Sequence, residues 1–512
     1  MNTPNKSGGL SLFPLTALVV GSIIGSGMFN LPQNMAENAG GVAIVIAWLI
    51  TFAGMLCLTL LYQQLSIRRP TIFGGPYGYA REGFGDFIGF SNAWGRWIAS
   101  MSGNAAYLVM LMAAFGGFTF FDFFSDAAGG NFTIFNVFGD GTTGPATLGA
   151  LVILWFTHFL VFMGVRTAAF INTIVTLAKV VPILFFIAVA VALFQSNIFE
   201  QGLWGPGNLG SLMDAGEGVL ANIFSGKTEG LLFGQVRDSM LYTAWVFVGV
   251  ESASIYSARA KDMKTVARAT VLGFVITLVL YMSVSLLSLG LIPQAELATM
   301  SAPSMRAIMA VVLGPTAAMI INLGVIISVA GAFLAWTMLA AESLYITALE
   351  EKDTGPKMFG KTNSNGAPTV ALWWTNIVVS IMLICAYFFG KGYNELILLA
   401  TSMYLIPYLF SALYGISVAK SGKSGNKIMD KKFLLTTLLA SVYSVWLIYA
   451  AGIEFLLASM ILYATGILLF FYRRKEDKLP LIAGGKELAC ILVVIVAAVY
   501  ACYALATGAI TL

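Results

Sequence analysis

Residues 21–32 read Gly21-Ser22-Ile23-Ile24-Gly25-Ser26-Gly27-Met28-Phe29-Asn30-Leu31-Pro32, and they lie within the first long apolar segment of the chain. Three glycines and two serines in the first seven positions weaken a helix, because each interior glycine costs roughly 1 kcal/mol relative to alanine. Within lipid, a broken helix persists only where its freed backbone groups face protein, water or a ligand. The stretch therefore predicts either close packing against another helix or an opening that binds something.

The composition indicates a membrane protein. Of 512 residues, 58% are hydrophobic and only 10% are charged, and the mean hydropathy is +0.85. A soluble domain would have about 25% charged residues. Apolar runs of about 20 residues, the length that crosses a bilayer, recur along the whole chain. We therefore expect an all-α polytopic membrane protein.

The hydropathy pattern predicts twelve transmembrane helices and a thirteenth near the C-terminus. The expected spans are 12–33, 41–65, 86–117, 146–164, 167–194, 238–258, 269–292, 313–346, 368–389, 393–418, 433–452, 454–472 and 487–509.

Basic residues are distributed unevenly between the predicted loops. One set of alternate loops contains most of the lysines and arginines, whereas the other set contains only Lys227, Arg237, Arg306 and Lys391. Cytoplasmic loops concentrate Lys and Arg, so the N-terminus is predicted to be cytoplasmic. The glycine-dense loop 74–85 would then be cytoplasmic, and its Arg81 and Glu82 predict either a gate lock or a solvated pair in a tight turn.

A second interruption occurs in the sixth predicted span, which reads Trp245-Val246-Phe247-Val248-Gly249-Val250-Glu251-Ser252. Paired interruptions in two halves of a chain point to an inverted-repeat transporter with its site at the bilayer midplane. Half-helix N-termini would offer N–H groups to a carboxylate, and freed C=O groups would accept from an ammonium, which suits an amino acid. The alternative is that these glycines only allow close helix packing. A nucleotide site is rejected because no strand precedes the glycines, and no nucleic-acid partner is expected.

Ionisable residues deep in a span suggest function, since the free-energy cost of burying their charge must be offset by a partner, by water or by neutralisation. Glu251 could gate, take up a proton or attract a cation. Lys179, in the fifth span, could place an ammonium beside unwound backbone where other transporters bind sodium. Arg96, in the third span, must find an anion or a cavity, and a salt bridge with Glu251 and a contact with substrate are both open.

Two tryptophans, Trp245 and Trp336, fall at mid-depth rather than in the interfacial belts where tryptophan is common. Each could form a lid over a substrate or a cation–π contact, and core packing is the alternative for each. No metal or cofactor is expected, because the four cysteines have no metal-ligand spacing. These cysteines are Cys57, Cys385, Cys490 and Cys502.

Taken together, these residues resemble the amino acid–polyamine–organocation superfamily, and within it the basic amino acid/polyamine antiporters, most closely the arginine/ornithine antiporters. The resemblance runs over nearly the whole chain. It is carried by Gly25 to Phe29, Gly75 to Gly85, Gly89 to Gly95, Trp245 to Glu251, and Ala335-Trp336-Thr337.

The resemblance implies a LeuT-like fold with a 5+5 inverted repeat. It implies one transporter domain over 1–512, with repeats at 1–194 and 238–418 and additional C-terminal helices at 433–512. It also implies a multi-pass protein of the bacterial inner membrane that exchanges an external amino acid for an internal amino acid or its metabolic product. A homodimer is compatible with this assignment.

The resemblance also implies roles for individual residues. Ser26 and Gly27 would meet the substrate carboxylate, and Asn104 would contact the substrate from the third span. The predicted substrate-binding residues are Ile23, Gly25, Ser26, Gly27, Arg96, Asn104, Trp245, Gly249 and Trp336. The predicted gating and coupling residues are Glu251, Lys179, Ser402 and Tyr404.

Arg96 departs from the family pattern, which usually has a tyrosine at this position near the gate. A fixed positive charge would repel a cationic side chain by about 1–4 kcal/mol at 4 Å. The leading hypothesis is a basic amino acid as substrate, and the alternative is a neutral or acidic amino acid or an amine. A sensor or channel would need a regulatory domain or a continuous pore. An enzyme is not expected, because the sequence shows no group of catalytic residues other than those already assigned to gating.

Overall fold

The computed structural model describes residues 12–70, 72, 75–117, 136–163, 165–205, 232–249, 263–349, 354–421 and 430–510. These residues are overwhelmingly helical, and within them the only β pairing is an isolated bridge between Thr362 and Pro368. Helices are expected here because a lipid-embedded backbone must satisfy its own N–H and C=O groups. The predicted all-α membrane fold is confirmed.

Ten helices within the described ranges are long and apolar enough to cross a membrane. They match the predicted second to fourth and seventh to twelfth spans, and the last matches the predicted thirteenth. Their bounds are α3 Gly41–Arg68, α5 Asp86–Gly116, α7 Gly144–Met163, α13 Met263–Ser288, α16 Pro315–Tyr345, α17 Thr369–Phe389, α18 Tyr393–Ser421, α19 Lys431–Ala450, α20 Gly452–Glu476 and α21 Gly485–Ala506.

The other three predicted spans are the fifth and the two interrupted ones. The fifth is α8, Val165–Ala192. The first, expected as 12–33, consists of two helices, α1 (Leu12–Ile23) and α2 (Gly27–Asn38). The sixth begins as α12 (Leu232–Trp245), and residues 250–262 lie outside the described part of the chain.

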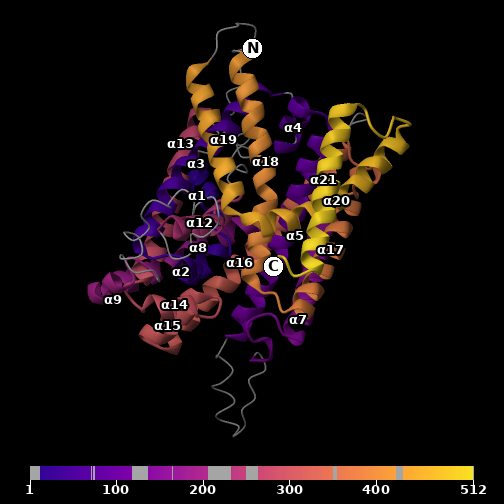
Figure 1. Cartoon of the computed structure of the whole chain (residues 1–512). Coiled ribbons are helices and arrows are strands. Elements are labelled where there is room, and N and C mark those ends of the chain that lie inside the picture. Colours follow the sequence, from indigo (N-terminus) through magenta and orange to yellow (C-terminus); the bar gives the residue numbers. More distant parts are fainter. Residues whose placement is uncertain are drawn as a thin grey trace.

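Short helices occupy the two ends of the helical bundle. Figure 1 shows α4 (Pro76–Phe84) at one end, and α9 (Ser196–Gln201), α14 (Gln294–Ala298) and α15 (Ser304–Leu313) at the opposite end. The tight turn considered for residues 74–85 is therefore wrong. Pro76 stands in the first turn of α4, where its missing N–H is not needed, so the glycines bound a helix at Gly75 and Gly85 rather than preventing one.

The third predicted span, α5, lies at the centre of the bundle. Nearly all of its membrane-crossing window is buried, and it packs against both α16 and α18. A helix that is apolar around its whole circumference is normally enclosed by protein. Consequently, side chains on different faces of α5 reach different parts of the interior.

The thirteenth helix, α21, lies beside α20 at the edge of the bundle (Figure 1). Glu487 of α21 pairs with Arg474 of α20 at 3.0 Å. Arg474 also approaches Asp86 at 3.4 Å, and Asp86 pairs with Arg81 of α4 at 3.0 Å. Since the Arg474 side chain is only 8% exposed, these carboxylates offset the cost of its burial.

Replacing Glu487 by glutamine should destabilise the protein, because the nearly buried Arg474 loses its closest carboxylate. We expect the free energy of unfolding to fall by about 1.5–3 kcal/mol, the usual value for a hydrogen bond to a charged group. The measurement is the midpoint of thermal unfolding in detergent. Glu200→Gln, on the exposed helix α9, is the control and should leave the midpoint unchanged. Equal midpoints for the two variants would contradict this account of how α21 is attached.

Candidate functional site

The first interruption leaves Ile24, Gly25 and Ser26 outside both α1 and α2. Ser26 stands at the N-cap position of α2, but its side chain makes no capping hydrogen bond. Its hydroxyl is instead hydrogen-bonded to the Tyr393 hydroxyl of α18 at 2.9 Å. The first N–H groups of α2 are thus not capped by Ser26, and a helix N-terminus of this kind attracts negative charge.

The second interruption follows Trp245. The chain continues in tight turns, in which Phe247 N–H donates to Ala244 O and Val248 N–H donates to Trp245 O, each at 3.0 Å. Gly249 has a φ of +97°, in the region that favours glycine. The predicted break at Gly249 is therefore real. Glu251 lies outside the described residues.

The glycines bring the two interruptions into direct contact. A Cβ atom on Gly27 would lie 2.6 Å from Val246 Cγ1 and 2.9 Å from Trp245 Cδ1. A Cβ atom on Gly103 of α5 would lie 2.8 Å from Trp245 Cη2. The close packing that the sequence left as one alternative is observed, because Gly27 lets the start of α2 lie against Trp245. Binding of a ligand at this segment stays a prediction.

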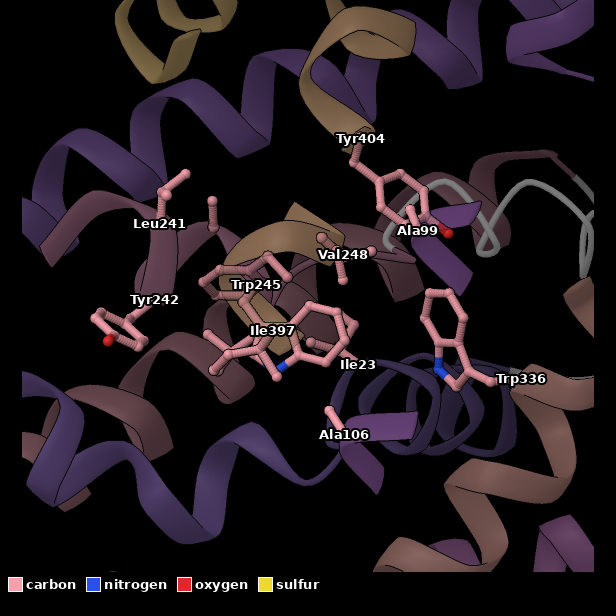
Figure 2. Close-up of a cluster of buried hydrophobic side chains, with 14 of the residues drawn as sticks. Ile23, Ala99, Ala106, Leu241, Tyr242, Trp245, Val248, Trp336, Ile397 and Tyr404 are labelled. Carbon is pink, nitrogen blue, oxygen red and sulfur yellow. The ribbon is translucent and has the colours of Figure 1, made fainter. Parts of the chain in front are cut away.

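Trp245 lies in the middle of a buried cluster, with Trp336 and Tyr404 to one side (Figure 2). Its ring is 6.0 Å from that of Tyr107, whose hydroxyl would be 2.8 Å from a Cβ atom on Gly25. Trp336 of α16 makes an edge contact with Tyr404 of α18 at 6.2 Å. The two tryptophans thus belong to one aromatic region formed by α5, α12, α16 and α18.

One face of α5 runs through this region. Arg96, Ser100, Gly103 and Tyr107 are spaced by four, three and four residues, which places them on the same side of a helix. Ser100 is hydrogen-bonded to the Tyr404 hydroxyl at 3.2 Å, and Gly103 and Tyr107 meet Trp245. Arg96 is half-buried and lies on this face, toward the α4 end of α5.

Asn104 is fully buried on α5, and neither atom of its amide has a hydrogen-bond partner among the described residues. An unpaired buried polar group costs about 1–3 kcal/mol. Such a group is expected where a polar ligand or water completes the hydrogen bonding. Asn104 is therefore well suited to binding a ligand.

Lys179 meets the interrupted backbone directly. Its side chain is fully buried, and Nζ donates to Ile24 O at 3.1 Å and to Gly21 O at 3.3 Å. These carbonyls lie at and just beyond the end of α1, where four C=O groups lack helical partners. The ammonium therefore satisfies backbone oxygens that would otherwise attract a cation.

Ser402, unlike Tyr404, makes its side-chain hydrogen bond within its own helix. It is buried, but its hydroxyl donates to Leu399 O of the same helix at 2.8 Å. Such a bond is local to α18. The structure thus brings Tyr404, but not the Ser402 hydroxyl, into hydrogen-bonding contact with α5.

The sequence reasoning missed three tyrosines: Tyr107, Tyr281 and Tyr393. Tyr281 of α13 is fully buried, and its hydroxyl lies 3.1 Å from Ile23 O and 3.0 Å from Val246 O. Tyrosines in apolar spans have no distinguishing pattern. The only available signal was the presence of a hydroxyl deep in a membrane helix, where it needs a partner.

The start of α2 is bonded to Tyr393, and its middle is held by amides that the sequence reasoning also missed. Asn30 Oδ1 accepts from Ser304 N–H of α15 at 3.1 Å, and Asn30 Nδ2 donates to Asn394 of α18 at 3.3 Å. Gln33 Nε2 donates to Ala298 O of α14 at 3.2 Å. Polar side chains therefore tie α2 to three other elements.

Comparison with known proteins identifies the family. The sequence model described as "Amino acid permease" matches residues 10–454. An arginine/ornithine antiporter of Pseudomonas aeruginosa is 41% identical, with 98% of each chain covered. An arginine/agmatine antiporter of Chlamydia abortus is 35% identical over 93% of this chain and 92% of its own. An L-lysine transport protein of Corynebacterium glutamicum is 35% identical, with 93% of each chain covered.

These matches extend over the interrupted spans and the central helix α5 as well as the rest of the bundle. The chain belongs to the amino acid permease family, within the amino acid–polyamine–organocation superfamily, and has the LeuT-like all-α membrane fold of that family.

Proposed function

We propose that the protein is an antiporter of the bacterial inner membrane that exchanges amino acids by alternating access, with cationic amino acids as substrates. The observation that carries this proposal is the meeting of the two interrupted spans at Gly27 and Trp245. A helix N-terminus and freed carbonyls then lie close together, which suits the opposite charges of an amino acid. No enzymatic role is proposed, because the similar proteins are transporters.

The shared part of the substrate would bind at the interruptions. The N–H groups at Ser26 and Gly27 would hold the carboxylate, with Gly25 adjacent. The ammonium would lie near the carbonyls of Ile23 and of the segment that ends at Gly249. Charge-assisted hydrogen bonds of this kind are roughly twice as strong as neutral ones, which favours binding of the zwitterion over a neutral analogue.

The substrate side chain would lie in the aromatic region. Trp245 would cover it, and Trp336 would form the far wall. Asn104 would supply an amide that has no hydrogen-bond partner within the described part of the chain. An aromatic face attracts a cation, particularly a guanidinium. The relatives named for arginine, ornithine, agmatine and lysine support a cationic substrate.

The positive charge of Arg96 is the feature that favours a neutral or acidic substrate over a cationic one. The relatives' names do not favour that alternative. We propose that Arg96 lies beyond the aromatic region along α5, where its charge acts on the exit path more than on the bound side chain. Its position two helical turns from Gly103 supports this role.

Coupling and gating are assigned to four residues. Lys179 would replace a sodium ion by donating to the freed carbonyls of α1, and its two bonds to Gly21 and Ile24 support this role. Glu251 would gate beside the second interruption. Tyr404 would gate through Ser100 and Trp336, whereas Ser402 would contribute through packing in α18.

We further propose the arrangement of the chain in the membrane. Residues 1–194 and 238–418 would form the two inverted repeats, and 433–512 the additional helices. An interruption in the first helix of each half supports this division. The N-terminus and α4 would be cytoplasmic, as the positive charge of the alternate loops indicates.

The direct test of the proposed function is counterflow. Purified protein is reconstituted into proteoliposomes that are preloaded with unlabelled arginine, ornithine, glutamate or alanine, and uptake of labelled arginine is measured. We expect arginine and ornithine inside the vesicles to raise uptake by about tenfold, since carriers that return only when loaded need an exchange partner. The exchanger proposal is wrong if none of the four amino acids drives uptake at any pH.

Replacing Arg96 by tyrosine should shift the preference further toward cationic substrates. Removing a positive charge near the substrate path lowers repulsion by about 1–4 kcal/mol at 4 Å, and less at longer range. We therefore expect the ratio of arginine to glutamate uptake to rise. Arg96→Lys retains the charge and is the matched control. An unchanged ratio in Arg96→Tyr would show that Arg96 does not influence selectivity.

Replacing Lys179 by methionine should reduce exchange severely. Methionine retains an unbranched side chain that is shorter by only the terminal atom. The carbonyls of Gly21 and Ile24 lose their donor in a buried setting, which costs about 1–3 kcal/mol. We expect turnover of labelled arginine to fall about tenfold or more. Lys431→Met, at the exposed start of α19, should retain full activity. Normal turnover in Lys179→Met would remove Lys179 from the coupling mechanism.

A further inference from the structure

Tyr281 connects the two interrupted spans through one hydroxyl group. Ile23 is the last residue of α1, and Val246 is the first residue after α12. The Tyr281 hydroxyl lies within hydrogen-bonding distance of both carbonyls, at 3.1 Å and 3.0 Å. The Tyr281 side chain thus contacts one backbone carbonyl at each interruption.

The Tyr281 hydroxyl gives both carbonyls a hydrogen-bond donor. The last C=O groups of a helix have no partner within the helix, and in a dry interior an unpaired carbonyl is costly. Tyr281 and Val246 are buried, as is Ile23. Since a hydroxyl has one hydrogen, the two oxygens share it, and movement of either carbonyl changes the bond to the other.

The Tyr281 ring is held independently of the hydroxyl. It stacks on Trp48 of α3 with centroids 5.7 Å apart, and the ring of Phe247 meets it edge-on at 5.3 Å. Trp48 and Phe247 also meet edge-on at 6.2 Å. Because Phe247 directly follows Val246, the ring and the hydroxyl of Tyr281 both contact the second interruption.

We propose that Tyr281 is a positioning residue that makes the two interrupted spans move together. By sharing its hydrogen between Ile23 and Val246, it sets the spacing of the carbonyl ends beside the substrate. The empty carrier must then rearrange both spans in one step. This raises the barrier for an empty carrier to return and so favours exchange over net flux. The inference rests on the proposed antiport function and deepens it.

The test compares Tyr281→Phe with wild type in proteoliposomes loaded with labelled arginine. Efflux is measured with unlabelled arginine outside, which reports exchange, and without it, which reports net flux. Phenylalanine retains the packing on Trp48 and Phe247 and removes only the hydroxyl. We expect the ratio of exchange to net flux to fall about fivefold, the factor that corresponds to one lost hydrogen bond of average strength.

Tyr463→Phe is the matched control. Tyr463 is also buried, and its hydroxyl donates to one backbone carbonyl, Met403 O of α18, at 3.0 Å. A general effect of losing a buried hydroxyl should therefore appear in both variants. The specific effect on the ratio should appear only in Tyr281→Phe, with the KM for arginine nearly unchanged and both variants monodisperse in detergent.

The outcomes separate the two proposals. Wild-type protein that exchanges no amino acid overturns the proposed function and, with it, this role for Tyr281. Wild-type exchange with an unchanged ratio in Tyr281→Phe overturns the inference alone. A ratio that falls equally in Tyr463→Phe also overturns it, because the effect would then belong to lost stability rather than to the linkage of the two spans.

Discussion

The structure depends on one constraint: backbone groups freed at a helix interruption within a membrane must find partners. The first interruption releases carbonyls at Gly21, Ile23 and Ile24, and the second releases Val246. Lys179 and Tyr281 donate to these oxygens from α8 and α13. These oxygens are surrounded by packed helices, and the observed donors come from neighbouring helices. The helices around the interruptions therefore supply side-chain hydrogen-bond donors as well as packing surface.

The same constraint suggests that different parts of the protein would bind the amino acid backbone and the side chain of a substrate. The interruptions offer N–H and C=O groups, which in the proposed mechanism would recognise the carboxylate and the ammonium that all amino acids share. Side chains on helices that are not broken, such as Asn104 and Trp336, would recognise the side chain that differs between them, and Arg96 would act along the exit path. Selectivity can therefore change by substitution on α5 and α16 without disturbing the backbone geometry. This division fits a family whose relatives are named for several different cationic substrates.

Much of the site was predictable because its signals are local. Glycine and serine in an apolar run predicted both interruptions, and a lysine deep in a span predicted its contact with unwound backbone. The tyrosine partners were not predictable. Tyr281 lies 258 residues from Ile23, and Tyr393 lies 367 residues from Ser26, so nothing near either tyrosine in the chain marks its role. The helix α4 was not predicted, because the glycines in and around residues 74–85 indicate a loop.

Residue type and spacing alone decided the class of protein, the places where two spans break, and the depth of the buried charges. These follow from hydropathy and backbone propensity, which act over a few residues. The tertiary structure alone decided which groups meet: Gly27 with Trp245, Lys179 with Ile24, and Tyr281 with both interruptions. The physical reason is that a hydrogen bond forms only at about 3 Å, and that distance is set by how helices remote in the chain pack together.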